Sequence, residues 1–487
     1  MTIFSRHAKA RASGLMKLAA AAFGLGAMAL PVFAQPKPTV HAVVDLAHEF
    51  SFYADGRFAK QYLKDQKAVT SWGTLFKFDL TNANLLVLLA CAPQLAYWPE
   101  DLAAINRFLA DGGGVVILGS GPGPQNDLAK KFGASFEKGA SGPLKGSAEL
   151  GTNKVEGLVG TRLVLEQPAL WTVLVLDAKN NPVLARRKHG AGQVLIGARS
   201  LAGSRPDASD PINAAWLSPL LARLASGKKV DAARPFKGRG LTPGDYVEDH
   251  DGLKLHYSDY LKPYAKSMFA ISQKCKPVIE KRMGVPLSPG MASEIGLLAT
   301  GGGGFSSGRV IGLAVWWGGF PEREDSMIEF ITHESVHSWV LPHAEIWNEP
   351  IATYVGNLVM MDMGYEEEAG KRIKRTIERA RKHDPEMKLY DLAGNSISGA
   401  PKLEGGAQTD THWGKAFWIF EQLRKERPDF MARYFQAKRR LAAPGKITKY
   451  DANNTVAVLS VAMGRDMFPW FREHGFDVSR AKAEIKE

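Results

Sequence analysis

The first half of the chain alternates short apolar runs with segments of helical periodicity. Residues 40–44, 85–90 and 115–118 are continuous apolar runs of the length of a β-strand. Between the last two runs, residues 99–110 carry apolar side chains at helical spacing, and the glycines of residues 111–114 end that helix. This order predicts a strand, helix, strand unit of a parallel sheet.

Further strand-like runs and one more helix follow this unit. The runs cover residues 162–165, 172–176 and 193–196, a turn covers 189–192 and a helix covers 211–224. The sequence therefore predicts an α/β domain over residues 38–226. It resembles the class I glutamine amidotransferase-like fold, which has a flavodoxin-like parallel sheet. Cys91 lacks the flanking glycines of a nucleophile elbow and no His-x-Glu dyad follows it, so we expect this domain to be noncatalytic.

The composition changes between residues 227 and 251, a polar segment rich in Gly and Pro that predicts an interdomain linker. Beyond it, residues 257–283 have the pattern of a helix and residues 291–317 read as strands interrupted by glycines. The remainder is largely helical. We therefore expect a second domain over residues 252–487, of α+β class and mostly helical.

Length and charge limit the function classes. A chain of 487 residues exceeds one ordinary core and predicts several domains. The formal net charge is +12, but Lys and Arg are spread along the chain, and their densest run, residues 371–382, has the apolar spacing of a solvated helix. A nucleic-acid partner is therefore not expected.

The N-terminal residues have the pattern of a cleavable secretory signal. Basic residues precede an apolar stretch over residues 18–30, and Val32, Phe33 and Ala34 offer a signal peptidase its small residues, so residues 1–34 form the predicted signal peptide. We expect a periplasmic or secreted protein with no stable membrane anchor after cleavage. Only two cysteines are present, Cys91 and Cys275, and a disulfide between them is neither required nor excluded.

The segment His333-Glu334-Ser335-Val336-His337 carries the candidate chemistry. Four residues separate the two histidines, which places both imidazoles on one face of a helix, as a shared zinc ion requires. Glu334 then faces a water on the metal and can act as a general base. Ser326 and Glu329 have the spacing of a capping box at the start of this helix.

A catalytic zinc site needs a third protein ligand, and two residues downstream qualify. His343 follows His337 by six residues, the spacing of the metzincins, but Val340 stands where those enzymes have a glycine. Glu349 begins a second predicted helix, in which Pro350 suits the first turn. Glu349 is the favoured ligand and His343 stays the alternative.

Asn348-Glu349-Pro350-Ile351-Ala352 after the histidine motif resembles the gluzincin metallopeptidases. Residues 460–476 also resemble the helical ending of enhancin-like and mucin-degrading peptidases, some of which carry an amidotransferase-like domain. The resemblance implies a zinc cofactor and a protein, peptide or glycoprotein substrate. It also implies an oxyanion donor after the third ligand, which favours His412 over Tyr354. Thr353 departs from the family, where an Asp orients the first histidine.

The same resemblance implies that residues 309–317 form a strand that borders the cleft and pairs with an extended substrate. The resulting hypothesis is an exported zinc metallopeptidase in which His333, His337 and Glu349 bind the metal and Glu334 and His412 are catalytic. The alternative is a noncatalytic cell-envelope binding protein on a degenerate peptidase scaffold. Amidotransferase activity through Cys91 ranks third.

Overall fold

The computed structural model describes the chain from residue 39 to residue 483 with several gaps. The described ranges are 39–45, 47–48, 54–64, 66–71, 73–89, 93–157, 160–202, 211–238, 244–300, 302–339, 346–442 and 450–483. The predicted signal peptide, Cys91 and His343 lie outside them. Among the described helices none has both the length and the apolar character that crossing a membrane requires.

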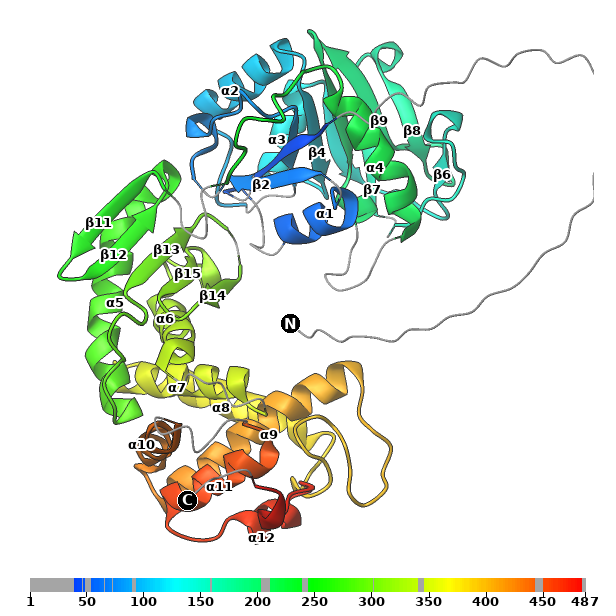
Figure 1. The fold of residues 1–487 in the computed structure, drawn as a ribbon. Helices are drawn as coiled ribbons and strands as arrows, with labels where there is room; N and C mark the ends of the chain where they lie inside the picture. Colours follow the sequence, from blue (N-terminus) through cyan, green and yellow to red (C-terminus); the bar gives the residue numbers. More distant parts are fainter. Residues whose placement is uncertain are drawn as a thin grey trace, which may run out of the picture. The chain divides into compact units, whose positions relative to one another are not determined.

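An eight-stranded sheet organises the first part of the chain (Figure 1). Its order is β2 (Lys67–Ser71), β1 (His41–Asp45), β3 (Leu85–Leu88), β4 (Gly114–Gly119), β10 (Gly192–Ala198), β9 (Pro182–His189), β8 (Thr172–Leu176) and β6 (Lys145–Gly146). The first five strands in this order, β2, β1, β3, β4 and β10, are parallel to one another. The last three strands, β9, β8 and β6, each pair antiparallel with the strand before them in the order. This part of the chain therefore has an α/β fold with a mixed sheet.

The prediction of a parallel sheet is wrong for the strands beyond β10. A tight turn at residues 190–191 joins β9 to β10, and such a short connection can only join antiparallel strands. The predicted strand over residues 162–165 is not part of the large sheet. It belongs to β7 (Thr161–Leu165), which pairs with β5 (Ala134–Lys138) in a separate two-stranded sheet.

Helices cover both faces of the large sheet. Side chains of α1 (Ala54–Tyr62) and α4 (Pro211–Ala225) join one apolar core. Those of α2 (Pro99–Ala110) and α3 (Pro124–Lys131) join a second core on the other face. The layers are helix, sheet, helix, because strands that are apolar on both sides must be covered on both sides.

The predicted linker is ordered over residues 227–238 and lies against the strands of the large sheet. Lys228 donates from Nζ to the Leu80 carbonyl at 2.9 Å, and the backbone N–H of Asp231 donates to Asn82 Oδ1 at 2.8 Å. Phe236 stacks on His41. The residues of this segment thus contact the sheet where β1 and β3 begin. The division at residues 226 and 252 stays a prediction.

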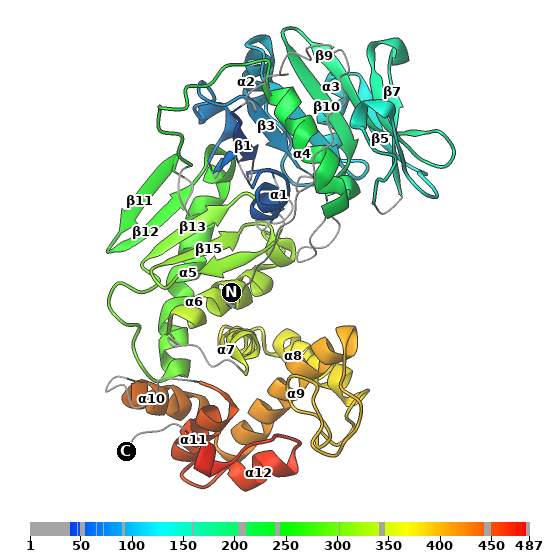
Figure 2. The ribbon, with the colours of Figure 1, turned by 45° about the vertical axis from the view of Figure 1, so that its right-hand side comes forward.

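A smaller, five-stranded sheet follows (Figure 2). Its order is β11 (Tyr246–His250), β12 (Leu253–Tyr257), β13 (Glu294–Leu298), β15 (Val310–Ala314) and β14 (Gly304–Ser306), with only the two outer strands antiparallel. Two helices pack against it, α5 (Lys262–Met283) and α6 (Glu324–Trp339). β14 is the outermost strand beside β15.

The rest of the described chain is helical. It comprises α7 (Asn348–Asp362), α8 (Glu366–Arg381), α9 (Gly405–Glu426), α10 (Phe430–Ala442), α11 (Ala452–Met463) and α12 (Phe468–Glu473). One apolar core runs through these helices and the five-stranded sheet. Cys275 of α5 is a free thiol buried in that core. Burial raises the pKa of this thiol to about 12, so it is an inert core residue.

The predicted capping box before the histidine motif is wrong. Helix α6 begins at Glu324, so Ser326 lies within its first turn. The Ser326 hydroxyl instead accepts a hydrogen bond from the Arg372 guanidinium of α8 at 2.9 Å. The acidic residues Glu324 and Asp325 occupy the N-terminal turn, where negative charge is favourable to the helix dipole. Glu329 is therefore not a capping residue, and it lies buried inside the helix.

Candidate metal centre

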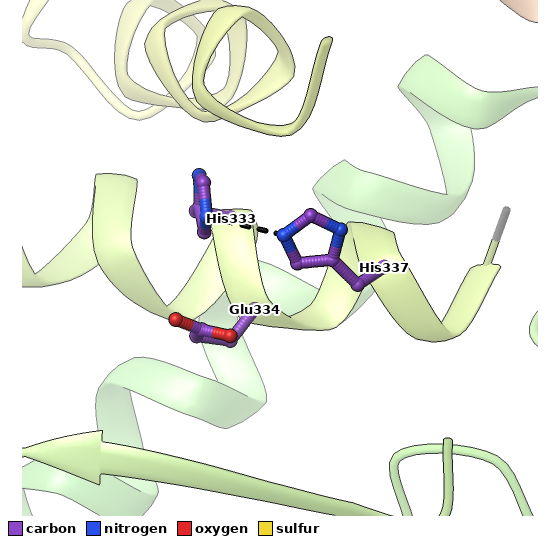
Figure 3. A group of neighbouring side chains, drawn as sticks. All are labelled: His333, Glu334 and His337. Atoms are coloured by element: carbon purple, nitrogen blue, oxygen red, sulfur yellow. Dashed lines mark hydrogen bonds between the residues drawn. The ribbon is translucent and has the colours of Figure 1, made fainter. Parts of the chain in front are cut away.

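His333 and His337 lie one turn apart on α6, with their rings on the same side of the helix (Figure 3). Their Nε2 atoms are 3.2 Å apart. Both side chains are mostly covered, with 13% and 10% of their surface exposed. The helical spacing read from the sequence thus brings the two nitrogens together.

Glu349 completes the cluster from the first turn of α7. Its carboxylate oxygens lie 3.2 Å from His333 Nε2 and 3.6 Å from His337 Nε2. Three ligands around a tetrahedral zinc ion, each about 2.0–2.1 Å from the metal, are separated by roughly 3.3 Å. The contacts between the three side chains are therefore close to this separation, with a different oxygen of Glu349 facing each histidine.

The start of α7 is fixed by the residues on either side of Glu349. Trp347 is fully buried and packs against the rings of Phe420 and Phe471. Pro350 lies in the first turn, where its missing N–H leaves no helical hydrogen bond unmade. Glu349 stands between these two buried residues, yet 55% of its own side chain is exposed. The cluster is accessible from the side of Glu349.

A glycine lets the two helices that carry the ligands approach closely. A Cβ atom at Gly356 of α7 would lie 2.9 Å from the backbone oxygen of Glu329 in α6. Such contacts are shorter than side chains allow, so only glycine fits there. The close approach holds the preceding turns of α7, with Glu349 and Thr353, against His333.

Thr353 orients the first histidine. Its Oγ1 lies 2.9 Å from His333 Nδ1, on the opposite side of the ring from Nε2. When Nδ1 carries the proton and donates it to Thr353, Nε2 presents a lone pair to the cluster. The residue that departs from the gluzincin pattern thus still makes the orienting contact, with a neutral hydroxyl.

Electrostatics couple the three ligand side chains. Hydrogen bonds from His333 and His337 lower the pKa of Glu349, against the opposing effect of its partial burial. Burial alone would lower the pKa of His333, but its contact with Glu349 and the charges of Glu329 and Glu334 raise it. The three side chains are therefore electrostatically coupled, with Glu349 held in its charged form by the two histidines.

Glu334 points to a different side of α6 from the two histidines (Figure 3). It is 5% exposed, and burial raises its pKa to about 7. Together with His333 and His337 it forms a group whose ligand atoms lie within 4.8 Å of one another. Glu349 contacts both histidines at 3.2 and 3.6 Å, which favours Glu349 over Glu334 as the third candidate ligand.

The strand next to Glu334 is β14, and the predicted substrate strand is not at the edge of the sheet. β15 covers most of the predicted segment, and it pairs with β13 on one side and β14 on the other. An interior strand has no free edge for a substrate, so that prediction is wrong. In β14, a Cβ atom at Gly304 would lie 2.5 Å from Glu334 Oε1.

We expect Gly304→Ala to lower kcat about 100-fold with zinc affinity unchanged. The added methyl group would lie 2.5 Å from both Glu334 Oε1 and the Phe330 ring. Ordinary contact requires shifts of about 1 Å in these side chains, and a misplacement of that size at a catalytic base costs about this much. Gly406→Ala is the matched control, since a Cβ there meets no atom within 4 Å. Steady-state kinetics and zinc titration of both variants test this, and full activity in Gly304→Ala would contradict the placement.

The two oxyanion candidates lie in different surroundings. Tyr354 is fully buried, and its hydroxyl donates to Glu421 at 2.6 Å, so it serves the core. His412 of α9 lines a cavity of about 550 Å³ together with Ile346 and Trp413, and its Nδ1 lies 3.1 Å from the Leu392 carbonyl. No hydrogen bond or ion pair of the described residues joins His412 to the metal cluster. Its catalytic role stays a prediction.

Comparisons with known proteins assign no family. Neither a family model nor a curated protein matches the chain. Among solved structures, it is similar to the exo-β-1,4-mannosidase Op5Man5 from Opitutaceae bacterium strain TAV5, with 16% identity and a TM-score of 0.28. That match covers 40% of this chain and 37% of the mannosidase, so the chain spans well under half of that protein.

Two further structures show similarly weak likeness. The cytoplasmic protein STM3548 from Salmonella typhimurium is 12% identical with a TM-score of 0.29, over 38% of this chain and 98% of that one. A functionally unknown conserved protein from Bacillus anthracis str. Ames is 12% identical with a TM-score of 0.30, over 72% and 68%. Similarity this low carries no argument about fold or function, which leaves the site itself as the basis for a proposal.

Proposed function

We propose that this protein is a zinc-dependent peptidase whose metal ligands are His333, His337 and Glu349. The observation that carries the proposal is the convergence of these three side chains from two helices. The two Nε2 atoms are 3.2 Å apart, one oxygen of Glu349 lies 3.2 Å from His333 Nε2, and its other oxygen lies 3.6 Å from His337 Nε2. Two imidazoles and one carboxylate are a donor set that catalytic zinc sites use, with one position left open. The exposure of Glu349 supports an open position.

The chain's own residues supply the rest of the chemistry. A zinc ion held by His333, His337 and Glu349 would supply Lewis-acid chemistry, which polarises a carbonyl group and lowers the pKa of a water. Glu334, buried beside the cluster, takes the proton of the attacking water and returns it to the leaving amine. Thr353 holds the His333 ring in the tautomer that directs Nε2 to the metal. Gly304 leaves the Glu334 carboxylate the space it needs.

Peptide bonds are the proposed substrate because of the gluzincin-like sequence around Glu349. The motif Asn348-Glu349-Pro350 begins a helix, as the resemblance implies. Export by the N-terminal signal and a noncatalytic α/β domain complete the proposal. Proteins, peptides and glycoproteins of the cell envelope or its surroundings are the expected substrates.

Metal content and chelator sensitivity test the proposal. We expect about one zinc per chain after purification without chelator. Hydrolysis of a peptide library by the mature protein should stop on treatment with a strong chelator and return on addition of zinc. A folded wild-type protein that binds no zinc would overturn the proposal. Zinc binding without peptidase activity would retain the metal site and reject the reaction.

The pH dependence of kcat/KM should show an acidic limb set by Glu334. A general base acts in its deprotonated form, so activity is lost as the pH falls through its pKa. Burial raises that pKa from 4.5 to about 7, and a bound cation moves it back down. The midpoint of the limb is therefore expected between these values. A pH profile of the zinc-loaded enzyme that stays flat from about pH 4.5 to about pH 7 would contradict this role.

A further inference from the structure

Glu329 is a buried carboxylate that the proposed reaction does not use. It lies one helical turn before His333, on the same face of α6, and is 9% exposed. Gly356 of α7 covers it, since a Cβ there would lie 3.0 Å from Glu329 Cγ and 3.3 Å from Oε1. No hydrogen bond or ion pair to the Glu329 side chain occurs among the described residues.

A buried carboxylate without hydrogen-bond donors is costly unless positive charge lies nearby. Burial raises the pKa of Glu329, and the positive charge of Arg372 and of a protonated His333 opposes this effect. The Arg372 guanidinium donates hydrogen bonds to Asp325 at 2.6 Å and to Glu368 at 3.3 Å. The compensation available to Glu329 is therefore the His333 imidazole and any cation bound to it.

The only polar contact to His333 Nδ1 among the described residues is the neutral hydroxyl of Thr353. Histidines that bind metals usually donate this second N–H to a carbonyl, a carboxylate or a water, and a carboxylate there makes the ring a stronger ligand. Thr353 fixes the ring but adds no charge. A negative charge close to the same ring has to come from elsewhere in the structure.

We propose that Glu329 is a positioning residue of the metal centre, whose carboxylate supplies to His333 the negative charge that Thr353 lacks. Residues of two helices act on the His333 ring: Thr353 of α7 sets its orientation, and Glu329 of α6 raises its affinity for a cation. The inference rests on the proposed function only in that a cation binds at this site, and it does not depend on peptide hydrolysis.

Zinc affinity of the full-length mature protein, measured by competition with a chelator, tests the inference. Glu329→Gln keeps the shape of the side chain and removes the charge. It should weaken zinc binding about 10- to 100-fold, the range found for outer-sphere partners of metal ligands. The urea midpoint of the metal-free protein should not fall, because a buried charge has been removed. Glu324→Gln, on the same helix, is the control and should bind zinc like the wild type.

A second variant, Thr353→Asp in the wild-type background, keeps the inference testable if Glu329→Gln does not fold. It adds a carboxylate at His333 Nδ1. Because Glu329 already supplies charge to the ring, we expect the gain in zinc affinity to stay below about 10-fold. Where Glu329→Gln folds, Thr353→Asp in that background should restore zinc affinity to within a few fold of wild type.

The outcomes separate this inference from the proposed function. Wild-type affinity in Glu329→Gln would overturn the role of Glu329. A gain of 10-fold or more in the single variant Thr353→Asp would do the same, since it would show that Glu329 does not already supply this charge to His333. Failure of the wild type itself to bind zinc would instead reject the proposed function.

Discussion

Replacing Glu334 with Gln is expected to abolish peptide hydrolysis, with kcat lowered about 100- to 10,000-fold, while the protein still folds and binds zinc. The size of the loss is that of removing a general base from a metal-assisted reaction. Gln keeps the volume and the polarity of the side chain beside Gly304, but it cannot accept the proton of the attacking water. KM should change little, because the carboxylate acts on the water and not on the bound peptide.

We expect Glu334→Gln to fold, because it replaces a buried carboxylate with an uncharged amide. A pKa raised from 4.5 to about 7 means that the charged carboxylate destabilises the metal-free protein at pH values above about 7, by about 3 kcal/mol. The raised folded-state pKa makes this cost disappear as the pH falls, and Gln removes it at every pH. Thermal unfolding of the chelated proteins measures the difference. Activity retained in Glu334→Gln would show that another group takes the proton.

The proximity of the two histidines could be predicted from the sequence because their spacing is local. Four residues on a helix place His333 and His337 on one face whatever surrounds them. Glu349 required more, since eleven residues lie between it and His337, but Pro350 and the apolar residues that follow it predicted a new helix at this place. The structure brings these three residues together as predicted.

Other parts of the site depend on packing between distant segments, which a periodic pattern does not encode. The sequence pattern predicts that Glu329 is a capping residue, whereas the structure shows a buried carboxyl group that Gly356 of α7 covers. Position 353 looked like a loss of the orienting contact, whereas its hydroxyl makes that contact at 2.9 Å. Both facts follow from how α6 meets α7.

Strand order was the least predictable feature of the fold. The apolar runs identified most strands correctly, but the pairing of β9 with β10 and the interior position of β15 are set by connections and neighbours. A strand buried on both faces has the same pattern at the centre of a sheet as near its border. For that reason the sequence assigned the substrate strand to residues 309–317, while the strand that touches Glu334 is β14.

Replacing Glu349 with Ala is expected to weaken zinc binding by more than the 10- to 100-fold attributed to Glu329, and to remove activity with it. Glu349 provides one of three donor atoms and the only formal negative charge among them. Its loss leaves two imidazoles, whose shared contact with the carboxylate is also gone. Chelator competition on the wild type and the variant measures the loss.

His343→Ala is the matched comparison, because His343 is the other third ligand that the sequence allows. If Glu349 is the ligand, His343→Ala keeps zinc affinity close to that of the wild type and Glu349→Ala does not. The reverse pattern would assign the site to the metzincin spacing and contradict the cluster described above. Glu349→Asp adds a finer test. The Asp side chain is one methylene shorter, so its oxygens would lie farther from the two imidazole nitrogens. Zinc affinity should therefore fall between those of the wild type and Glu349→Ala.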